Sequence, residues 1–339
     1  FDIPLIVKSS EVDKNYNSEL VHTLNIQLNL SEYCWQATLL QSNEQATLIV
    51  TGCHSVIDGL SLTMLTKEFL ALLNNQSIPE KLSQGLPDPI ETSLQLSSTE
   101  YNKQGKWNDN FALPFQGADP GLTQRRTEIY VLTLDIMLTS MVIKKAKTAG
   151  LSVNDCLAGA YIASITEMLP NAKEIALFTP INLRGYCQPT IALEQVMCAA
   201  TTVTSIHKNN EHSVIEHALD YHHQAKEKIK TIENHLNVNI AADVDKYMTL
   251  ALRQRDTFFY GFGISNLGRF DFGTTMNDAF HLTSFCFSGS KVGADCPMLM
   301  AIVSTNNQMS IVFNFVTPLI EKVWVERLAK YFQNTLLNL

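Results

Sequence analysis

Apolar positions along this chain recur with two periods, which predict a mixture of strands and helices. Continuous or alternating apolar runs rich in Val, Ile and Phe are typical of strands, and apolar residues spaced three and four apart are typical of helices. The segments predicted as strands are 1–7, 33–40, 46–50, 129–134, 175–181, 258–266, 279–288, 298–304 and 309–315. The segments predicted as helices are 12–28, 62–73, 139–149, 153–168, 211–235 and 323–337. Strand and helix signals in two unequal halves indicate an α/β or α+β sandwich of two similar lobes.

Capping signals predict where two of these helices begin. Ser61 stands before the apolar stripe that ends at Leu73, and a serine there can cap a helix by accepting from a backbone N–H. Ser152 and Asp155 resemble a capping box, with Asp in the place of the usual Glu. We therefore expect helices to start directly after Ser61 and Ser152.

A long polar segment separates the two halves. Residues 75–127 are rich in Asn, Gln, Ser, Pro and Gly and show no sustained apolar period. This composition predicts a crossover linker. The expected organisation is an N-terminal lobe over 1–74, the linker over 75–127 and a C-terminal lobe over 128–339.

Composition narrows the class of protein. The chain has 339 residues, of which 45% are hydrophobic and 17% charged, which is ordinary for a globular protein. Its formal net charge of −8 argues against broad nucleic-acid binding. No apolar stretch approaches the ~20 residues that a membrane-spanning helix needs. Seven scattered cysteines indicate free thiols in a reducing compartment, so we expect a cytoplasmic protein.

The string from His54 to Gly59 carries the clearest chemical signal. His54 follows a predicted strand and precedes a predicted helix, so it lies where the strand ends. An imidazole that is neutral at pH 7 can accept a proton from an attacking hydroxyl, amine or thiol. The carboxylate of Asp58 would turn back toward the backbone that holds His54 and fix the loop, for example by pairing with a distant Arg. Gly59 would permit a sharp exit from the loop.

Other interpretations of these residues stay open on the residues alone. A histidine at a strand end is often only a polar surface group. A metal shared by His54 and Asp58 is disfavoured, because the intervening residues form a poor helix and no further pair supplies ligands. We expect no metal. Cys53 is a candidate nucleophile, although its side chain should point away from that of His54 if both lie on the strand.

Two further groups of basic residues have alternative interpretations. Six histidines crowd one polar segment, where solvated helix positions are favoured over a metal site: His207, His212, His217, His222, His223 and His235. The pair Arg125 and Arg126 would bind CoA phosphates or simply flank the strand that follows.

Four motifs occur in an order that resembles the chloramphenicol acetyltransferase-like superfamily of CoA-dependent acyltransferases. This superfamily includes condensation domains, alcohol acetyltransferases and polyketide-associated acyltransferases. The matching segments are the strand, His-x-x-x-Asp-Gly loop and helix over 47–69, the Ser-Val-Asn-Asp helix start over 152–155, the strand ending in Arg over 180–184, and Ser-Asn-Leu-Gly over 265–268. Together they span most of the chain.

The resemblance implies a fold, an activity and site residues. The fold would be a two-lobed sandwich of two chloramphenicol acetyltransferase-like subdomains, with an active-site tunnel between them. His54 would be the general base and Asp58 would support it by pairing with Arg184 across the lobes. Gly59, Ser265 and Asn266 would contribute to substrate binding, with Ser265 or Asn266 as the oxyanion donor.

The implied reaction moves an acyl group from an acyl thioester, acyl-CoA or carrier-bound, to a hydroxyl or amine acceptor. It requires no cofactor beyond this co-substrate, and its partners are small-molecule donors and acceptors, with an acyl carrier protein as a further candidate. The alternative from another class is a catalytically inactive condensation-like module that binds a carrier, peptide or lipid.

Two departures from the family pattern accompany the resemblance. The His motif normally lies well over a hundred residues from the start, so we expect a further N-terminal strand and helix that this sequence lacks. The Asp-Phe-Gly-Trp-Gly loop of plant members is only echoed by residues 271–275, which argues against a plant-type enzyme.

Overall fold

The structure is a computed structural model that describes residues 3–9, 16–42, 45–78, 88–94, 121–210, 212–230, 261–275, 277–291 and 296–339. The chain divides into two compact units that interleave along the sequence. Unit 1 consists of Phe1–Ser93, Leu183–Ala200 and Phe272–Leu282, and unit 2 of Leu94–Asn182, Thr201–Asp271 and Thr283–Leu339. The expected boundaries of the lobes at 1–74 and 128–339, and of the linker at 75–127, stay a prediction.

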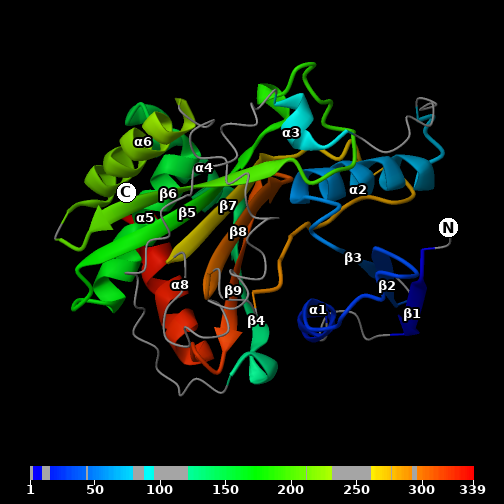
Figure 1. Cartoon of the computed structure of the whole chain (residues 1–339), viewed down its shortest axis with the longest axis horizontal. Helices are drawn as coiled ribbons and strands as arrows, with labels where there is room; N and C mark the ends of the chain where they lie inside the picture. The colour runs from blue at the N-terminus through cyan, green and yellow to red at the C-terminus, as the bar shows by residue number, and fades with distance from the viewer. Residues whose placement is uncertain are drawn as a thin grey trace. The chain divides into compact units, whose positions relative to one another are not determined.

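Unit 1 is built on a three-stranded sheet in the order β1-β2-β3 (Figure 1). Strand β1 runs parallel to β2, whereas β2 and β3 are antiparallel and place Trp35 opposite Gly52. The elements of this unit are β1 (Leu5–Ser9), α1 (Tyr16–Leu24), β2 (Trp35–Gln41), β3 (Ala46–Gly52), α2 (Gly59–Leu73), α3 (Ile90–Ser93) and the 3₁₀ turn η4 (Arg184–Tyr186). Strand β3 ends at Gly52, and the loop that carries His54 follows directly.

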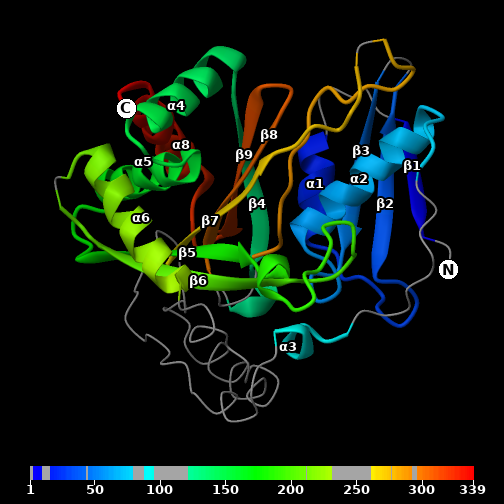
Figure 2. The same cartoon turned by 90° about the horizontal axis from the view of Figure 1, so that it is seen from above.

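Unit 2 contains a six-stranded sheet in the order β4-β9-β8-β7-β5-β6. Strand β9 is antiparallel to both of its neighbours, and β7 is parallel to both β8 and β5. Helices α4, α5, α6 and α8 gather on one face of this sheet (Figure 2). The elements are η3 (Leu122–Gln124), β4 (Arg126–Leu134), α4 (Ile136–Thr148), α5 (Val153–Met168), β5 (Glu174–Asn182), β6 (Ala200–Lys208), α6 (Val214–Lys230), β7 (Phe262–Arg269), β8 (Met298–Thr305), β9 (Gln308–Thr317) and α8 (Lys322–Leu337).

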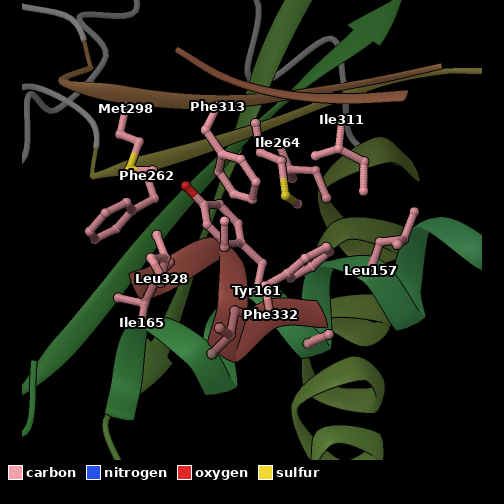
Figure 3. Close-up of a cluster of buried hydrophobic side chains, with 14 of the residues drawn as sticks. Leu157, Tyr161, Ile165, Phe262, Ile264, Met298, Ile311, Phe313, Leu328 and Phe332 are labelled. Carbon is pink, nitrogen blue, oxygen red and sulfur yellow. The ribbon is translucent and has the colours of Figure 1, made fainter. Parts of the chain in front are cut away.

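The core of unit 2 fills the space between the sheet and these helices (Figure 3). Tyr161 of α5 lies at its centre, with its ring edge-on to those of Phe262, Phe313 and Phe332 at centroid distances of 6.0, 6.2 and 6.3 Å. Burying each such aromatic side chain stabilises the fold by roughly 1.5–3 kcal/mol. Helices α5 and α6 also pack closely, since a Cβ on Gly159 would meet the carbonyl oxygen of Val214 at 2.6 Å.

The predicted fold class, a mixed α/β fold with two lobes, is confirmed, and most predicted elements are present. The capping box of α5 is present as predicted: the Ser152 side chain accepts from the backbone of Asp155, whose carboxylate accepts from the backbone of Ser152. Helix α4, however, begins at Ile136 and not at residue 139. The reason is that Asp135 caps it, with Oδ1 accepting from the Leu138 N–H at 2.7 Å.

Two predictions about strands were wrong. Strand β6 was missed because its buried positions include the polar residues Ser205 and His207, which hide the apolar alternation. The predicted strand over 279–288 does not form in the described residues 277–291. Side chains hold this segment instead of a backbone ladder: the carboxamide oxygen of Asn314 accepts from the Ser288 hydroxyl and, at 3.2 Å, from the Gly289 N–H.

Candidate active site

The loop between β3 and α2 positions His54 at the surface of unit 1. The backbone N–H groups of Val56 and Ile57 both donate to the Cys53 carbonyl, at 3.0 and 3.3 Å, and this closes a tight turn. Ile57 is only 2% exposed, and a Cβ on Gly52 would meet its Cγ2 at 2.8 Å. Glycine is therefore needed at the end of β3 for the loop to fold down. With Ile57 anchored inside, His54 is exposed.

A backbone carbonyl fixes the proton on His54. Its Nδ1 lies 2.8 Å from the carbonyl oxygen of Ile57. Because a carbonyl only accepts, Nδ1 must be the protonated nitrogen of this pair. In the neutral ring Nε2 then carries the lone pair. The loop thus presents a basic nitrogen on an exposed side chain.

Asp58 caps helix α2 and holds a buried ion pair. Its Oδ1 accepts from the Ser61 N–H at 2.8 Å, and its Oδ2 accepts from Arg184 Nη1 at 2.6 Å and from the Ala199 N–H at 3.1 Å. Burial by itself raises the pKa of Asp58, but hydrogen bonds from Arg184, Ser61 and Ala199 outweigh it, so the pKa lies below its ordinary value. Asp58 is consequently an anion at neutral pH with each oxygen engaged, and its geometry suits a structural task.

Arg184 is 1% exposed and joins several segments of unit 1. Its Nη2 donates to Ser61 Oγ at 2.8 Å and to the carbonyl oxygens of Met197 and Gln195 at 3.2 and 3.3 Å. The contact between Arg184 and Asp58 lies inside unit 1, because Leu183–Ala200 belongs to that unit. The predicted pair of Asp58 and Arg184 is therefore present, and it lies within unit 1 and does not join the two units.

Two details of the helix start also differ from expectation. Asp58, and not Ser61, is the cap of α2, since the helix begins at Gly59. Gly59 is not among the described glycines with a positive φ, so the loop does not need it for a left-handed exit. Ser61 has a role that the sequence did not suggest: its buried hydroxyl donates to the Met197 carbonyl at 3.1 Å and accepts from Arg184. Ser61 follows Asp58 by three residues, and this spacing could have predicted that the Asp58 carboxylate caps the helix by accepting from the Ser61 N–H.

Ser265 and Asn266 lie on β7 in unit 2, where both are half-buried. The side-chain carbonyl of Asn266 accepts from the Gly268 N–H at 2.8 Å, next to a register irregularity of the strand. Its Nδ2 therefore remains as the donor end of the carboxamide.

A second histidine cluster in unit 2 has the order of groups found in hydrolytic triads. His207 of β6 is fully buried, with Nδ1 2.7 Å from Asp220 Oδ2 and Nε2 2.8 Å from Ser205 Oγ. Burial lowers the pKa of His207, although Asp220 acts in the opposite direction. Because Ser205 is only 2% exposed, its hydroxyl is inaccessible to a substrate. Sequence reasoning missed this cluster together with strand β6.

The prediction of solvated histidines was wrong for two members of the His-rich segment. His207 and His217 are 0% and 1% exposed, because they lie where β6 and α6 meet the interior. His222 contacts the Asp155 carboxylate at 3.0 Å, and His235 lies outside the described residues. Within the described ranges no group of three or more His, Cys, Asp or Glu side chains is arranged to hold a metal.

The remaining candidates have simple environments. Arg126 is the first residue of β4, where it flanks the strand, and Arg125 is only 6% exposed. Cys53 Sγ lies 3.0 Å from Ser55 Oγ. No helix in the described part of the chain combines the length and apolar composition that a membrane crossing needs.

The sequence is similar to those of known proteins, both to a family model and to a longer relative. Residues 123–271 match the family model for the C-terminus of phthiocerol/phthiodiolone dimycocerosyl transferase. A plipastatin synthase protein of Bacillus subtilis (strain 168) is 23% identical over 312 residues, which are 88% of this chain but 12% of that protein. This chain therefore spans only a small part of the length of that relative.

Solved structures resemble the chain over nearly all of its length. The condensation domain of the monacolin K polyketide synthase MokA superposes with a TM-score of 0.68 at 10% identity, covering 99% of this chain and 78% of that one. Polyketide synthase associated protein 5 from Mycobacterium tuberculosis gives 0.65 at 13% identity, covering 98% and 79%. The epimerization domain from the third module of tyrocidine synthetase B gives 0.63 at 14% identity, covering 99% and 79%. The chain accordingly has the condensation-domain fold that its motifs indicated.

Proposed function

We propose that this chain is an acyltransferase that moves an acyl group from a thioester to a hydroxyl or amine acceptor, with His54 as general base. The observation that carries the proposal is the contact between His54 Nδ1 and the Ile57 carbonyl at 2.8 Å, which makes Nε2 the basic nitrogen of the neutral ring. The C-terminal family match to a dimycocerosyl transferase supports acyl transfer as the general chemistry.

The proton follows a short route in this mechanism. His54 Nε2 takes the proton of the acceptor as its oxygen or nitrogen attacks the thioester carbonyl. The tetrahedral intermediate then collapses, the carbon–sulfur bond breaks, and the imidazolium returns the proton to the leaving thiolate. The products are an ester or amide and a free thiol. No covalent acyl-enzyme is needed.

Asp58 and Arg184 support the base without touching the reactants. Their buried ion pair fixes the start of α2 and the end of the His54 loop, because the same carboxylate caps the helix. Asp58 is thus proposed as a positioning residue. This role explains why both of its oxygens are engaged by protein donors.

Ser265 and Asn266 are the proposed donors to the oxyanion, and Gly59 is the proposed substrate contact at the start of α2. An oxyanion hole needs preorganised donors. The hydrogen bond from Gly268 N–H to Asn266 Oδ1 orients the carboxamide and makes Nδ2 its donor end, which supports Asn266 over Ser265.

The proposed co-substrate is acyl-CoA or an acyl carrier thioester, with no other cofactor. The seven cysteines, all of them within the described residues, form no disulfide, which supports the proposal of a reducing, cytoplasmic compartment. An acyl carrier protein is retained as a candidate partner, and turnover of carrier-bound but not CoA-bound donors would identify it.

The test is the release of free thiol when the protein is mixed with acyl-CoA or an acyl carrier thioester and a panel of alcohols and amines. His54→Ala should lower kcat by ~10²-fold or more with little change in melting temperature, since the side chain is exposed. His223→Ala is the matched control, because His223 is an exposed histidine on α6.

Two outcomes would reject the proposal. Wild-type turnover in the His54→Ala variant would exclude His54 as the base. Binding of a thioester donor without thiol release under any condition would favour the alternative of a catalytically inactive module that binds a carrier, peptide or lipid.

A further inference from the structure

Residues on both sides of Cys198 are held by the buried cluster around Arg184. The carbonyl of Met197 accepts from the Asp58 N–H at 3.3 Å, from Ser61 Oγ at 3.1 Å and from Arg184 Nη2 at 3.2 Å. The N–H of Ala199 donates to Asp58 Oδ2 at 3.1 Å, and its carbonyl accepts from the Leu183 N–H at 2.8 Å. The backbone of Cys198 is therefore fixed from both directions.

The thiol of Cys198 lies beside the imidazole of His54. Met197 and Ala199 are 7% and 0% exposed, whereas Cys198 between them is half-buried. The Sγ atom of Cys198 lies 4.0 Å from His54 Nδ1. The residues that bind Asp58 and the residue that contacts His54 thus share one rigid stretch of chain.

The contact is not that of an activated nucleophile. Nδ1 carries the proton that it donates to the Ile57 carbonyl at 2.8 Å, so it cannot accept a proton from the thiol. What the sulfur does at this distance is fill the space beside the protonated edge of the ring. A polarisable sulfur packs well against an aromatic ring edge.

We infer that Cys198 is a positioning residue that backs the His54 imidazole, so that Nδ1 stays on the Ile57 carbonyl and Nε2 stays directed to the acceptor. This inference rests on the proposed function of His54. It links the Asp58–Arg184 pair to the base through the backbone of residues 197–199. Without the sulfur, the ring could turn away from Ile57 and exchange its tautomers.

The test uses Cys198→Ala, with Cys34→Ala as control because Cys34 is another half-buried thiol of unit 1. Cys198→Ala should lower kcat by about tenfold with unchanged KM values, since small misplacements of a catalytic group are costly. Cys198→Ser should restore kcat to within about twofold of the wild type, because the hydroxyl again places an atom in the space beside the ring. Cys34→Ala should match the wild type.

A second measurement does not depend on turnover. In protein labelled with ¹⁵N-histidine, the ring nitrogens of His54 are assigned by their loss in His54→Ala. The wild type should show one protonated and one unprotonated nitrogen, and Cys198→Ala should shift both signals toward the average of the two tautomers. This result would support the positioning role even if no acyl donor is turned over.

Three results would overturn the inference. Unchanged ¹⁵N shifts of His54 in Cys198→Ala would show that the sulfur does not hold the ring. A rise in KM with unchanged kcat would place Cys198 in contact with substrate instead. An equal loss of kcat in the Cys34 control would trace the effect to the fold of unit 1.

Discussion

His54 and His207 are both hydrogen-bonded through Nδ1, but they differ in the properties that decide reactivity. His207 is fully buried and both of its nitrogens are engaged, by Asp220 at 2.7 Å and Ser205 at 2.8 Å. His54 is exposed, and a backbone carbonyl at 2.8 Å engages its Nδ1. The cluster with the more complete triad geometry is therefore the one that no substrate can reach.

The comparison shows that the two imidazoles differ in their access to solvent, which a general base needs in order to reach an acceptor. In the His207 cluster the serine and the imidazole satisfy each other inside the protein, which is a stabilising use of the same groups. At His54 the protein fixes the proton on Nδ1, so that the lone pair belongs to Nε2 of an exposed ring. The carboxylate of Asp58, the proposed positioning residue, contacts Arg184 and the backbone of Ser61 and Ala199.

The largest expected effect is the difference in the free energy of unfolding between variants of Asp58 and of Asp220. Asp58→Ala should lower the free energy of unfolding by ~3–5 kcal/mol, because it removes the carboxylate that pairs with the buried guanidinium of Arg184. Asp220→Ala should cost only about 1 kcal/mol, since the Asp220 side chain is 43% exposed. Urea denaturation of both variants measures the difference. Equal losses would show that the two clusters are energetically alike.

The next effect concerns His207 itself. His207→Ala should lower the free energy of unfolding by about 2–4 kcal/mol, because it opens a cavity and removes the partner of the buried Ser205 hydroxyl. Its kcat should stay at the wild-type value under conditions in which the variant is folded. A large loss of turnover with unchanged stability would instead assign the chemistry to His207.

The pH dependence of stability should come from buried histidines of unit 2. Burial, with His212 and His207 adding to it, lowers the pKa of His217 from 6.5 to about 4. The unfolded chain then binds the proton more readily, so stability is complete above about pH 6.5 and falls as the pH drops toward 4. His217→Gln should flatten this slope in denaturation curves at pH 7, 6, 5 and 4.5.

Asp58 affects stability in a lower pH range than His217 does. Its pKa lies below 3.8 in the folded chain, so its contribution is present above that value and is lost only as the pH falls further. A slope between pH 7 and 5 that persists unchanged in His217→Gln would assign the titration to another group, with His207 as the next candidate because its pKa is also lowered.

The smallest expected change in the free energy of unfolding concerns two buried tyrosine hydroxyls of unit 2. The Tyr161 hydroxyl is buried and has no hydrogen-bond partner among the described residues. Tyr161→Phe should therefore raise the free energy of unfolding by ~1 kcal/mol. Tyr221→Phe is the matched control and should lower it by ~1 kcal/mol, because that hydroxyl contacts Asn154 and Thr179 at 3.0 Å each. Equal signs for both variants would contradict this assignment.

Much of the fold follows from local patterns. The apolar periods predicted most strands and helices, because a buried strand or an amphipathic helix needs its pattern wherever it lies. The capping box at Ser152 was predictable since its partners are three residues apart. Where inward positions are polar, as at Ser205 and His207 in β6, the same reasoning failed.

The sequence by itself determined the loop that carries His54, because strand, turn and helix are local and adjacent. Only the tertiary structure decided which groups complete it. The Met197 and Ala199 backbone that meets Asp58, and the thiol of Cys198 beside His54, follow no spacing rule. They are brought together because Leu183–Ala200 folds into unit 1, more than a hundred residues along the chain from His54. Such long-range contacts depend on the packing of whole units, which no local pattern encodes.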